Sequence, residues 1–391
     1  MTSTQTPAPT TTSRASGGTV PAGGGRAGFG GVARRWGHRL ADRRFLPVAG
    51  ALLTLVLILV IGQARYSTDT RNFVNMRLFS NLLVDNSYLL VLAVGMTFVI
   101  LTGGIDLSVG AVVALVGLIV AKLLILGVPL PFVLLAGVLT GTVFGLLIGV
   151  LVQYFSIQPF IASLAAMFLA RGLCNLVSVE SLAIEDKDFT ALASWRIKFG
   201  HGPSIWYINL SMIVAVVVVL IAVYLLHYTR FGRTVYGLGA GDGGQAVGLM
   251  GLRAARTKVW VYVVSGTCAG IAGILFAFYT RSGFNLTGIG MELDAIASVV
   301  IGGAMLTGGS GFVLGSVVGV LVYGLIQVLI AREGLDSWWT KVFIGAVLLL
   351  FVLLQRALST GQTRRRKKNK DESPAAPADA PPPAPAAPSV G

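Results

Sequence analysis

The chain has 391 residues, of which 54% are hydrophobic and only 12% are charged. An ordinary soluble domain carries about 25% charged residues, so this composition excludes that class and favours a protein embedded in a membrane. The net charge of +14 comes from Lys and Arg at both ends and in one internal loop, without a basic stripe of interleaved aromatics. We therefore expect no nucleic-acid partner.

Both chain ends are predicted to be disordered tails on the cytoplasmic side. Residues 1–45 are rich in Thr, Gly, Ala and Arg, and residues 358–391 run from a basic cluster into a Pro/Ala-rich stretch, so neither has enough apolar area to fold alone. The basic cluster at 364–368 is either solvated or in contact with anionic lipid headgroups.

Between the tails, residues 46–357 contain ten apolar stretches, each near the ~20 residues that a bilayer requires. We therefore predict an all-α polytopic integral membrane protein. The ten predicted helices are 46–63, 82–102, 107–127, 130–152, 158–177, 206–227, 258–280, 293–307, 312–331 and 340–357. An even number places both termini on one side, and the distribution of Lys and Arg makes that side the cytoplasm of a cytoplasmic (inner) membrane. Three arginines then fall outside, and an interfacial helix over 70–81 would accommodate them.

The most informative stretch runs from Gly95 to Gly110, where a lone carboxylate, Asp106, lies in a glycine-rich break between two apolar runs. Hydrocarbon tolerates a charge and non-helical backbone only where they face protein, a water-filled cavity or the interface. Such a break is typical of a membrane protein that moves something across the bilayer.

An echo of this break occurs later in the chain, which suggests an internal repeat. Thr102-Gly103-Gly104 recurs as Thr307-Gly308-Gly309, each followed by a second glycine-containing run. An inverted repeat would need an odd number of helices between the copies, so either the helix count is off by one or the match is coincidental. The residues predicted to line or flex a translocation path are Thr102, Gly103, Gly104, Asp106, Ser108, Thr307, Gly308 and Gly309. The alternative for both breaks is simple tight helix packing.

The most polar internal cytoplasmic segment covers residues 228–258. A permease driven by a separate ATPase needs a short docking helix with apolar anchors, and Gln245–Leu252 fits in length and character; a solvated loop is the alternative. The chain contains no G-x-x-x-x-G-K-[ST] motif, so its energy must come from a partner or an ion gradient. The glycine-rich run 239–244 follows no strand and is interpreted as a linker.

These features resemble sugar permeases of ATP-binding-cassette importers of the ribose/galactose/xylose type. The resemblance rests on 95–110, 229–233, 265–270, 292–303 and 306–315, and covers about 45–357. Within that family, 166–172, 176–181 and 337–341 are most similar to permeases of the galactofuranose importer.

The resemblance implies a partner set and a docking site. The partners are an ABC ATPase subunit, an extracytoplasmic sugar-binding protein and a second permease chain in a homo- or heterodimer. The implied docking residues are Gln245, Ala246, Leu249, Met250, Gly251 and Leu252. The sequence departs from the family pattern at Asp242, where an amide is common.

We therefore expect a permease subunit that translocates a monosaccharide, with galactofuranose as the expected cargo. It would be no enzyme, without an ATPase site, and no metal or cofactor is expected, because the cysteines lie in apolar runs and the three histidines are scattered. The alternatives are a permease for ribose or another pentose or hexose, a gradient-driven secondary sugar carrier, and a membrane scaffold or receptor that only binds.

Overall fold

The computed structural model describes residues 46–67, 72–200, 205–241, 245–336 and 338–353. Both predicted tails, 1–45 and 358–391, lie outside these residues. Six described helices are long and apolar enough to cross a membrane, or seven if one bent pair counts as a span. The prediction of an all-α polytopic membrane protein is therefore confirmed.

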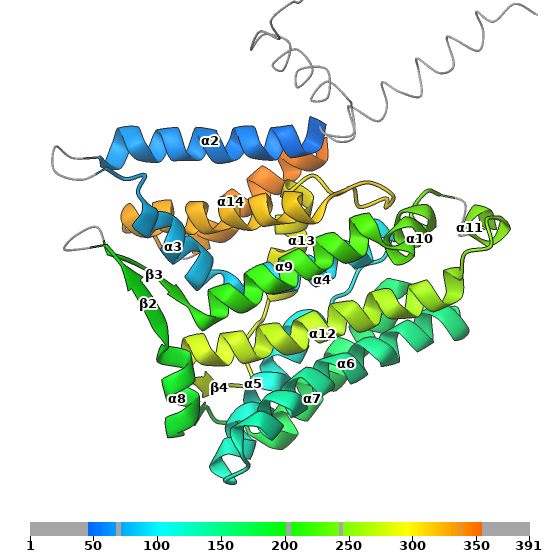
Figure 1. Ribbon diagram of the computed structural model, residues 1–391, viewed down its shortest axis with the longest axis horizontal. Coiled ribbons are helices and arrows are strands. Elements are labelled where there is room, and N and C mark those ends of the chain that lie inside the picture. The colour runs from blue at the N-terminus through cyan, green and yellow to red at the C-terminus, as the bar shows by residue number, and fades with distance from the viewer. Residues whose placement is uncertain (1–45, 68–71, 201–204, 242–244, 337, 354–391) are drawn as a thin grey trace, which may run out of the picture. The chain divides into compact units, whose positions relative to one another are not determined.

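The long and apolar helices run across the molecule in a packed array (Figure 1). They are α2 (Leu46–Tyr66), α3 (Met76–Asp85), α4 (Ser87–Leu101), α5 (Val109–Ile125), α6 (Leu130–Tyr154), α7 (Pro159–Val177), α9 (Leu210–Tyr228), α12 (Ala254–Thr280), α13 (Met291–Ile301), α14 (Val313–Arg332) and a last helix, Trp338–Leu353. Each of the ten predicted stretches overlaps a helix among these, but the helix predicted over 293–307 ends at Ile301, and residues 354–357 of the last one lie outside the described residues.

Short elements lie at the two ends of this array, on opposite sides in Figure 1. At one end are β1 (Leu182–Ala183), α8 (Lys187–Ser194), β2 (Arg196–Phe199), β3 (Trp206–Asn209) and β4 (Ser282–Gly283). At the other end are α10 (Arg230–Leu238) and α11 (Gln245–Leu249). The strands form two antiparallel pairs, β1 with β4 and β2 with β3.

The structure corrects several predicted boundaries. The predicted helix 82–102 is a bent pair, with α3 and α4 at 63°. Within the predicted interfacial helix 70–81, the described residues are helical only from Met76, where α3 begins, because Asn75 caps α3 by accepting a hydrogen bond from the Leu78 N–H at 2.8 Å. Asn209 caps α9 in the same way, so that helix starts four residues later than predicted and the preceding residues form β3.

Glycines at four-residue spacing bring pairs of helices into backbone contact. A Cβ built on Gly141 of α6 would lie 2.2 Å from the Gly266 carbonyl oxygen of α12. A Cβ built on Gly319 of α14 would lie 1.8 Å from the Ser298 carbonyl oxygen of α13. Only glycine permits such approaches, so these two pairs of helices are in backbone contact.

The centre of the helical array is α4, which carries buried side chains over nearly its whole length. It packs against α12, α13 and α14, so both predicted breaks lie beside it.

Arg171, a cation within the membrane helix α7, has hydrogen-bond partners. Its guanidinium donates to the carbonyl oxygens of Asn285 and Thr287, at 2.9 and 2.7 Å. This supplies the partner that a charge within a membrane helix requires.

Candidate functional site

The two breaks begin with the same helix cap. In α4, Gly103 has a φ of 77° and the Gly104 N–H donates to the Val99 carbonyl at 3.1 Å. In α13, Gly303 has a φ of 95° and the next N–H donates to the Val299 carbonyl at 3.2 Å. This glycine-dependent cap satisfies the last helical carbonyls without water. Both breaks can therefore lie in a low-dielectric interior.

Because the two caps match, the structural alignment of the breaks differs from the alignment of the repeated Thr-Gly-Gly sequences. Gly103 corresponds in structure to Gly303, although the repeated Thr-Gly-Gly pairs it with Gly308. The second break spans 302–312 and is longer than the first, which spans 102–108. The Thr-Gly-Gly match was therefore wrong as a structural correspondence, whereas duplication of the two halves stays a prediction.

The breaks also touch one another. The Gly309 N–H donates to the carbonyl oxygen of Leu101, the last residue of α4, at 2.9 Å. A Cβ built on Gly308 would lie 2.8 Å from the Gly103 nitrogen. The last helical carbonyl of α4 thus finds its partner in the second break, and movement of either break must disturb the other.

The lone carboxylate of the first break is fully buried and bonded to hydroxyl groups. Asp106 Oδ1 accepts from the Ser108 N–H at 3.0 Å and from Ser108 Oγ at 2.6 Å. Its other oxygen accepts from Ser265 Oγ of α12 at 2.8 Å. Asp106 therefore ties the first break to α12, and Asp106, Ser108 and Ser265 are all buried.

The end of α10 packs directly against both breaks. A Cβ built on Gly239 would lie 2.0 Å from the Leu101 carbonyl oxygen and 2.2 Å from the Gly309 nitrogen. One turn earlier, Tyr236 Oη donates to the Gly311 carbonyl oxygen at 2.7 Å. Sequence reasoning interpreted residue 239 as part of a linker; its backbone is the joint between the polar segment and the two breaks.

The predicted docking residues lie at the far side of α10. The short helix α11 holds the first of them, and Val247 anchors it: this side chain is fully buried and lies 2.7 Å from a Cβ built on Gly237 of α10. The apolar side chains that follow are free to meet a partner, since Leu249 is 90% and Met250 is 64% exposed. The helix has five residues rather than the eight predicted.

The predicted site residues therefore fall into two groups that α10 connects. The first group, at the meeting point of the breaks, comprises Thr102, Gly103, Gly104, Asp106, Ser108, Thr307, Gly308 and Gly309. The second group, in and just after α11, comprises Gln245, Ala246, Leu249, Met250, Gly251 and Leu252. Buried Val247 packs α11 against α10, and Gly239 packs the end of α10 against both breaks.

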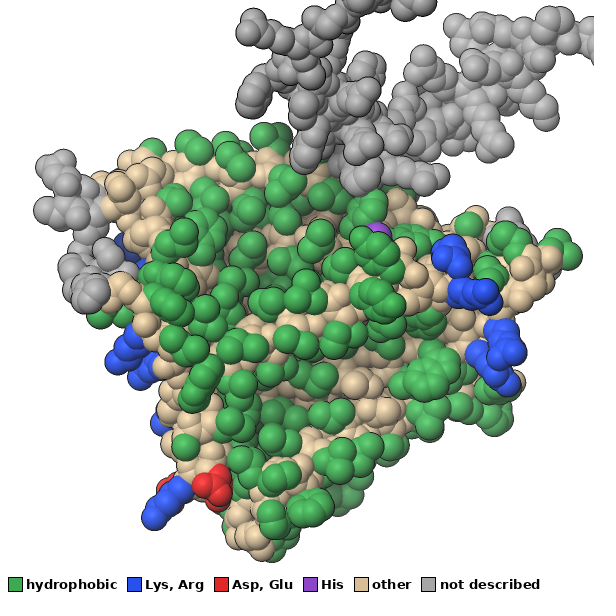
Figure 2. Space-filling model, viewed as in Figure 1, with side chains coloured by type: hydrophobic (Ala, Val, Ile, Leu, Met, Phe, Trp, Pro, Cys, Tyr) green, Lys and Arg blue, Asp and Glu red, His purple; other side chains and the backbone are tan. Residues whose placement is uncertain are grey.

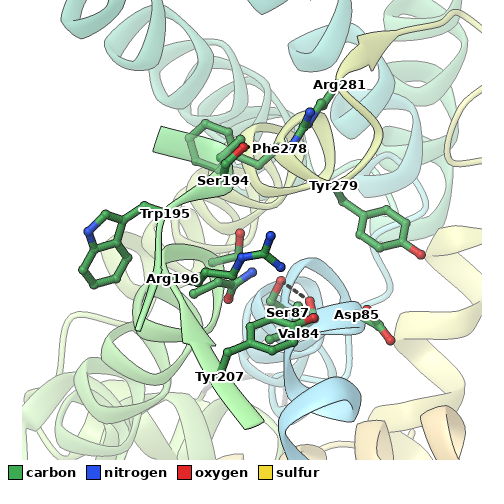
Figure 3. A pocket seen from close by; sticks show the side chains of 13 residues that line it. Val84, Asp85, Ser87, Ser194, Trp195, Arg196, Tyr207, Phe278, Tyr279 and Arg281 are labelled. Atoms are coloured by element: carbon green, nitrogen blue, oxygen red, sulfur yellow. Dashed lines mark hydrogen bonds between the residues drawn. The ribbon is translucent and has the colours of Figure 1, made fainter. Parts of the chain in front are cut away.

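A polar hollow that sequence reasoning missed lies at the other end of the array (Figure 3). It has a volume of about 210 Å³ and is lined by Asp85 beside the α3–α4 bend, Arg196 of β2, Tyr207 of β3 and the last turn of α12. The Arg196 guanidinium lies 5.7 Å from the Tyr207 ring centroid. The only signal in the sequence was the mixture of charged and aromatic residues between 180 and 209.

Comparison with known proteins identifies the family of the chain. The family model described as "Branched-chain amino acid transport system / permease component" matches residues 78–352. The chain belongs to this family of permease components.

Curated relatives match most of the chain. The fructose import permease protein FruG of Bifidobacterium longum is 43% identical over 320 residues, which cover 81% of this chain and 92% of that protein. The inner membrane ABC transporter permease protein YjfF of Escherichia coli is 42% identical, with 81% and 94% covered. The ribose import permease protein RbsC of E. coli is 34% identical, with 81% and 96% covered. No solved structure matches the chain.

Proposed function

We propose that the chain is the permease subunit of an ATP-driven importer that carries a monosaccharide across the cytoplasmic membrane. Two of its relatives are named as permeases for sugars, fructose and ribose. The observation that carries the proposal is the packing of Gly239 against both breaks. A permease driven by a separate ATPase needs such a connection between its docking surface and the broken helices.

In this proposal the partner ATPase binds the exposed apolar side chains at the end of α11 and just after it, chiefly Leu249 and Met250. ATP binding and hydrolysis on that partner shift the balance between states of the permease that open to opposite sides. A second permease chain completes the path, and an extracytoplasmic binding protein delivers the sugar at the end that carries β2 and β3. Both termini are then cytoplasmic.

Galactofuranose is the cargo that we propose, on the residues that resemble galactofuranose importer permeases. Fructose and ribose are the alternatives, supported by the names of two relatives. Because the binding protein would supply most of the specificity, the permease sequence alone discriminates these sugars weakly.

Uptake of galactofuranose, fructose and ribose, each labelled in a separate assay, tests cargo and function together. Matched cells with and without this chain are compared, with unlabelled galactofuranose, fructose and ribose as competitors. We expect chain-dependent uptake of galactofuranose that only unlabelled galactofuranose blocks. Equal competition by fructose or ribose would retain the permease and change the cargo. No chain-dependent uptake of any of the three sugars would contradict the proposed function.

A further inference from the structure

An apolar groove on the surface of the molecule ends at a cluster of arginines. The groove lies between α9, α4 and α12, has a volume of about 290 Å³, and is lined almost wholly by apolar side chains. Its walls include Val218 and Leu225 of α9 and Ile271 of α12. Figure 2 shows hydrophobic side chains over the face that carries α9 and α12, with Lys and Arg at both ends of it, one of which is the end where α10 and α11 lie.

A second hollow, of about 620 Å³, adjoins the groove at that end. Three arginines line it, Arg230 of α10 and Arg253 and Arg256 at the start of α12. Trp260 lines both the hollow and the apolar groove and is 59% exposed. An apolar slot and a cationic hollow therefore share one wall.

The charges in this hollow lack a protein counter-ion among the described residues. All three arginine side chains are exposed, and neither of the two ion pairs in the described part of the chain includes them. The sequence from 210 to 281 contains a single acidic residue, Asp242, which lies outside the described residues. Moreover, α12 begins at the hollow without a side-chain cap, and the N-terminus of a helix attracts anions.

We propose that an anionic phospholipid occupies this composite site, with its phosphate in the arginine hollow and an acyl chain in the apolar groove. An exposed tryptophan at the boundary suits the interface between headgroups and hydrocarbon. The arginines lie on the predicted cytoplasmic side, where anionic headgroups attract cationic side chains. The bound lipid links α10 to the start of α12, the two elements that flank the docking helix, so it steadies the segment through which the ATPase acts.

The test measures retention of phosphatidylglycerol on the purified chain by native mass spectrometry, with phosphatidylcholine of the same chain length as the neutral comparison. The main variant is Arg230→Gln/Arg253→Gln/Arg256→Gln. Its matched control, Lys122→Gln/Lys187→Gln/Lys198→Gln, removes the same charge at exposed positions that do not line the hollow. We expect the main variant to lose about a hundredfold in affinity for phosphatidylglycerol, since each cation near an anionic surface contributes roughly fivefold, and the control to bind like the wild type.

Two further variants separate the lipid from other ligands and from a folding defect. Replacing the three arginines by lysine keeps the charge and should restore most of the retention. Val218→Trp fills the groove, keeps every arginine, and should lower retention of long-chain phosphatidylglycerol while leaving binding of inorganic phosphate unchanged.

Three results would overturn the proposal. The first is equal phosphatidylglycerol retention by the main variant and its control. The second is unchanged retention in Val218→Trp. The third is loss of ATPase co-purification in the main variant with the lipid still bound, which would assign the arginines to the protein partner. None of these results depends on which sugar is carried, so the proposed cargo can fail separately.

Discussion

Replacing Gly239 by alanine should uncouple transport while leaving the fold intact. This residue has a φ of −84°, which alanine adopts without strain, so the effect is purely steric. The added Cβ would lie 2.0 Å from the Leu101 carbonyl oxygen, and contact closer than about 3.0 Å requires the backbones to separate. The end of α10 must therefore move by about 1 Å from both breaks.

The expected size of the effect follows from the cost of overpacking, about 1–3 kcal/mol. If that cost falls only on the state in which α10 packs against the breaks, the balance between the two states shifts by about 5- to 150-fold. Uptake should fall within this range, while the amount of chain in the membrane stays unchanged.

The assay compares initial uptake rates of Gly239→Ala with those of Gly172→Ala, normalised to the amount of each variant in the membrane. Gly172 is a suitable control because a Cβ built there meets nothing within 4 Å. Wild-type uptake by Gly239→Ala would refute the reasoning, since it would show that contact between α10 and the breaks is not needed for transport.

Three other substitutions test separate contacts. Val247→Ala removes the buried anchor of α11, which is worth about 1.5–3 kcal/mol, and should weaken ATPase binding about 10- to 100-fold in a co-purification titration. The control is Gly248→Ala, whose added Cβ meets open space. Unchanged binding in Val247→Ala, or an equal loss in the control, would argue against the anchor. Asp106→Ala leaves the buried hydroxyls of its serine partners unsatisfied, at a cost of about 1–3 kcal/mol each. It should therefore lower the thermal unfolding midpoint more than Asp106→Asn does. A lower midpoint in Asp106→Asn than in Asp106→Ala would contradict the buried network. Gly141→Val should prevent α6 from packing on α12 and remove most of the chain from the membrane fraction. A normal amount of Gly141→Val in the membrane, or the same loss in the control Gly172→Val, would count against this packing.

Apolar run length was enough to locate the helices. The ten apolar stretches each overlap a described helix, although α13 and the last helix, Trp338–Leu353, are shorter than the ~20 residues that a bilayer requires. The bend before Ser87 was not found, because hydropathy stays high through it and a 63° change of direction depends on tertiary packing. Strands β2 and β3 were missed since each has four residues and gains stability only from its partner.

The sequence predicted the two parts of the candidate site but not the contact that connects them. Glycines and a lone carboxylate mark the breaks locally, and so does the apolar character of the docking segment. The contact of Gly239 with Leu101 joins residues far apart in the chain, which no local pattern encodes. The repeated Thr-Gly-Gly misled the alignment because positive φ alone does not mark the cap: Gly308 and Gly309 also have positive φ, but Gly303 is the glycine that ends α13.

The most direct test of ATP-driven import uses proteoliposomes that contain the permease with its partner ATPase. The binding protein and labelled sugar are supplied on one side and ATP on the other. We predict accumulation that requires ATP hydrolysis, survives an ionophore, and falls in Gly239→Ala. Accumulation without ATP that an ion gradient drives and an ionophore abolishes would contradict it, and would identify the chain as a secondary carrier.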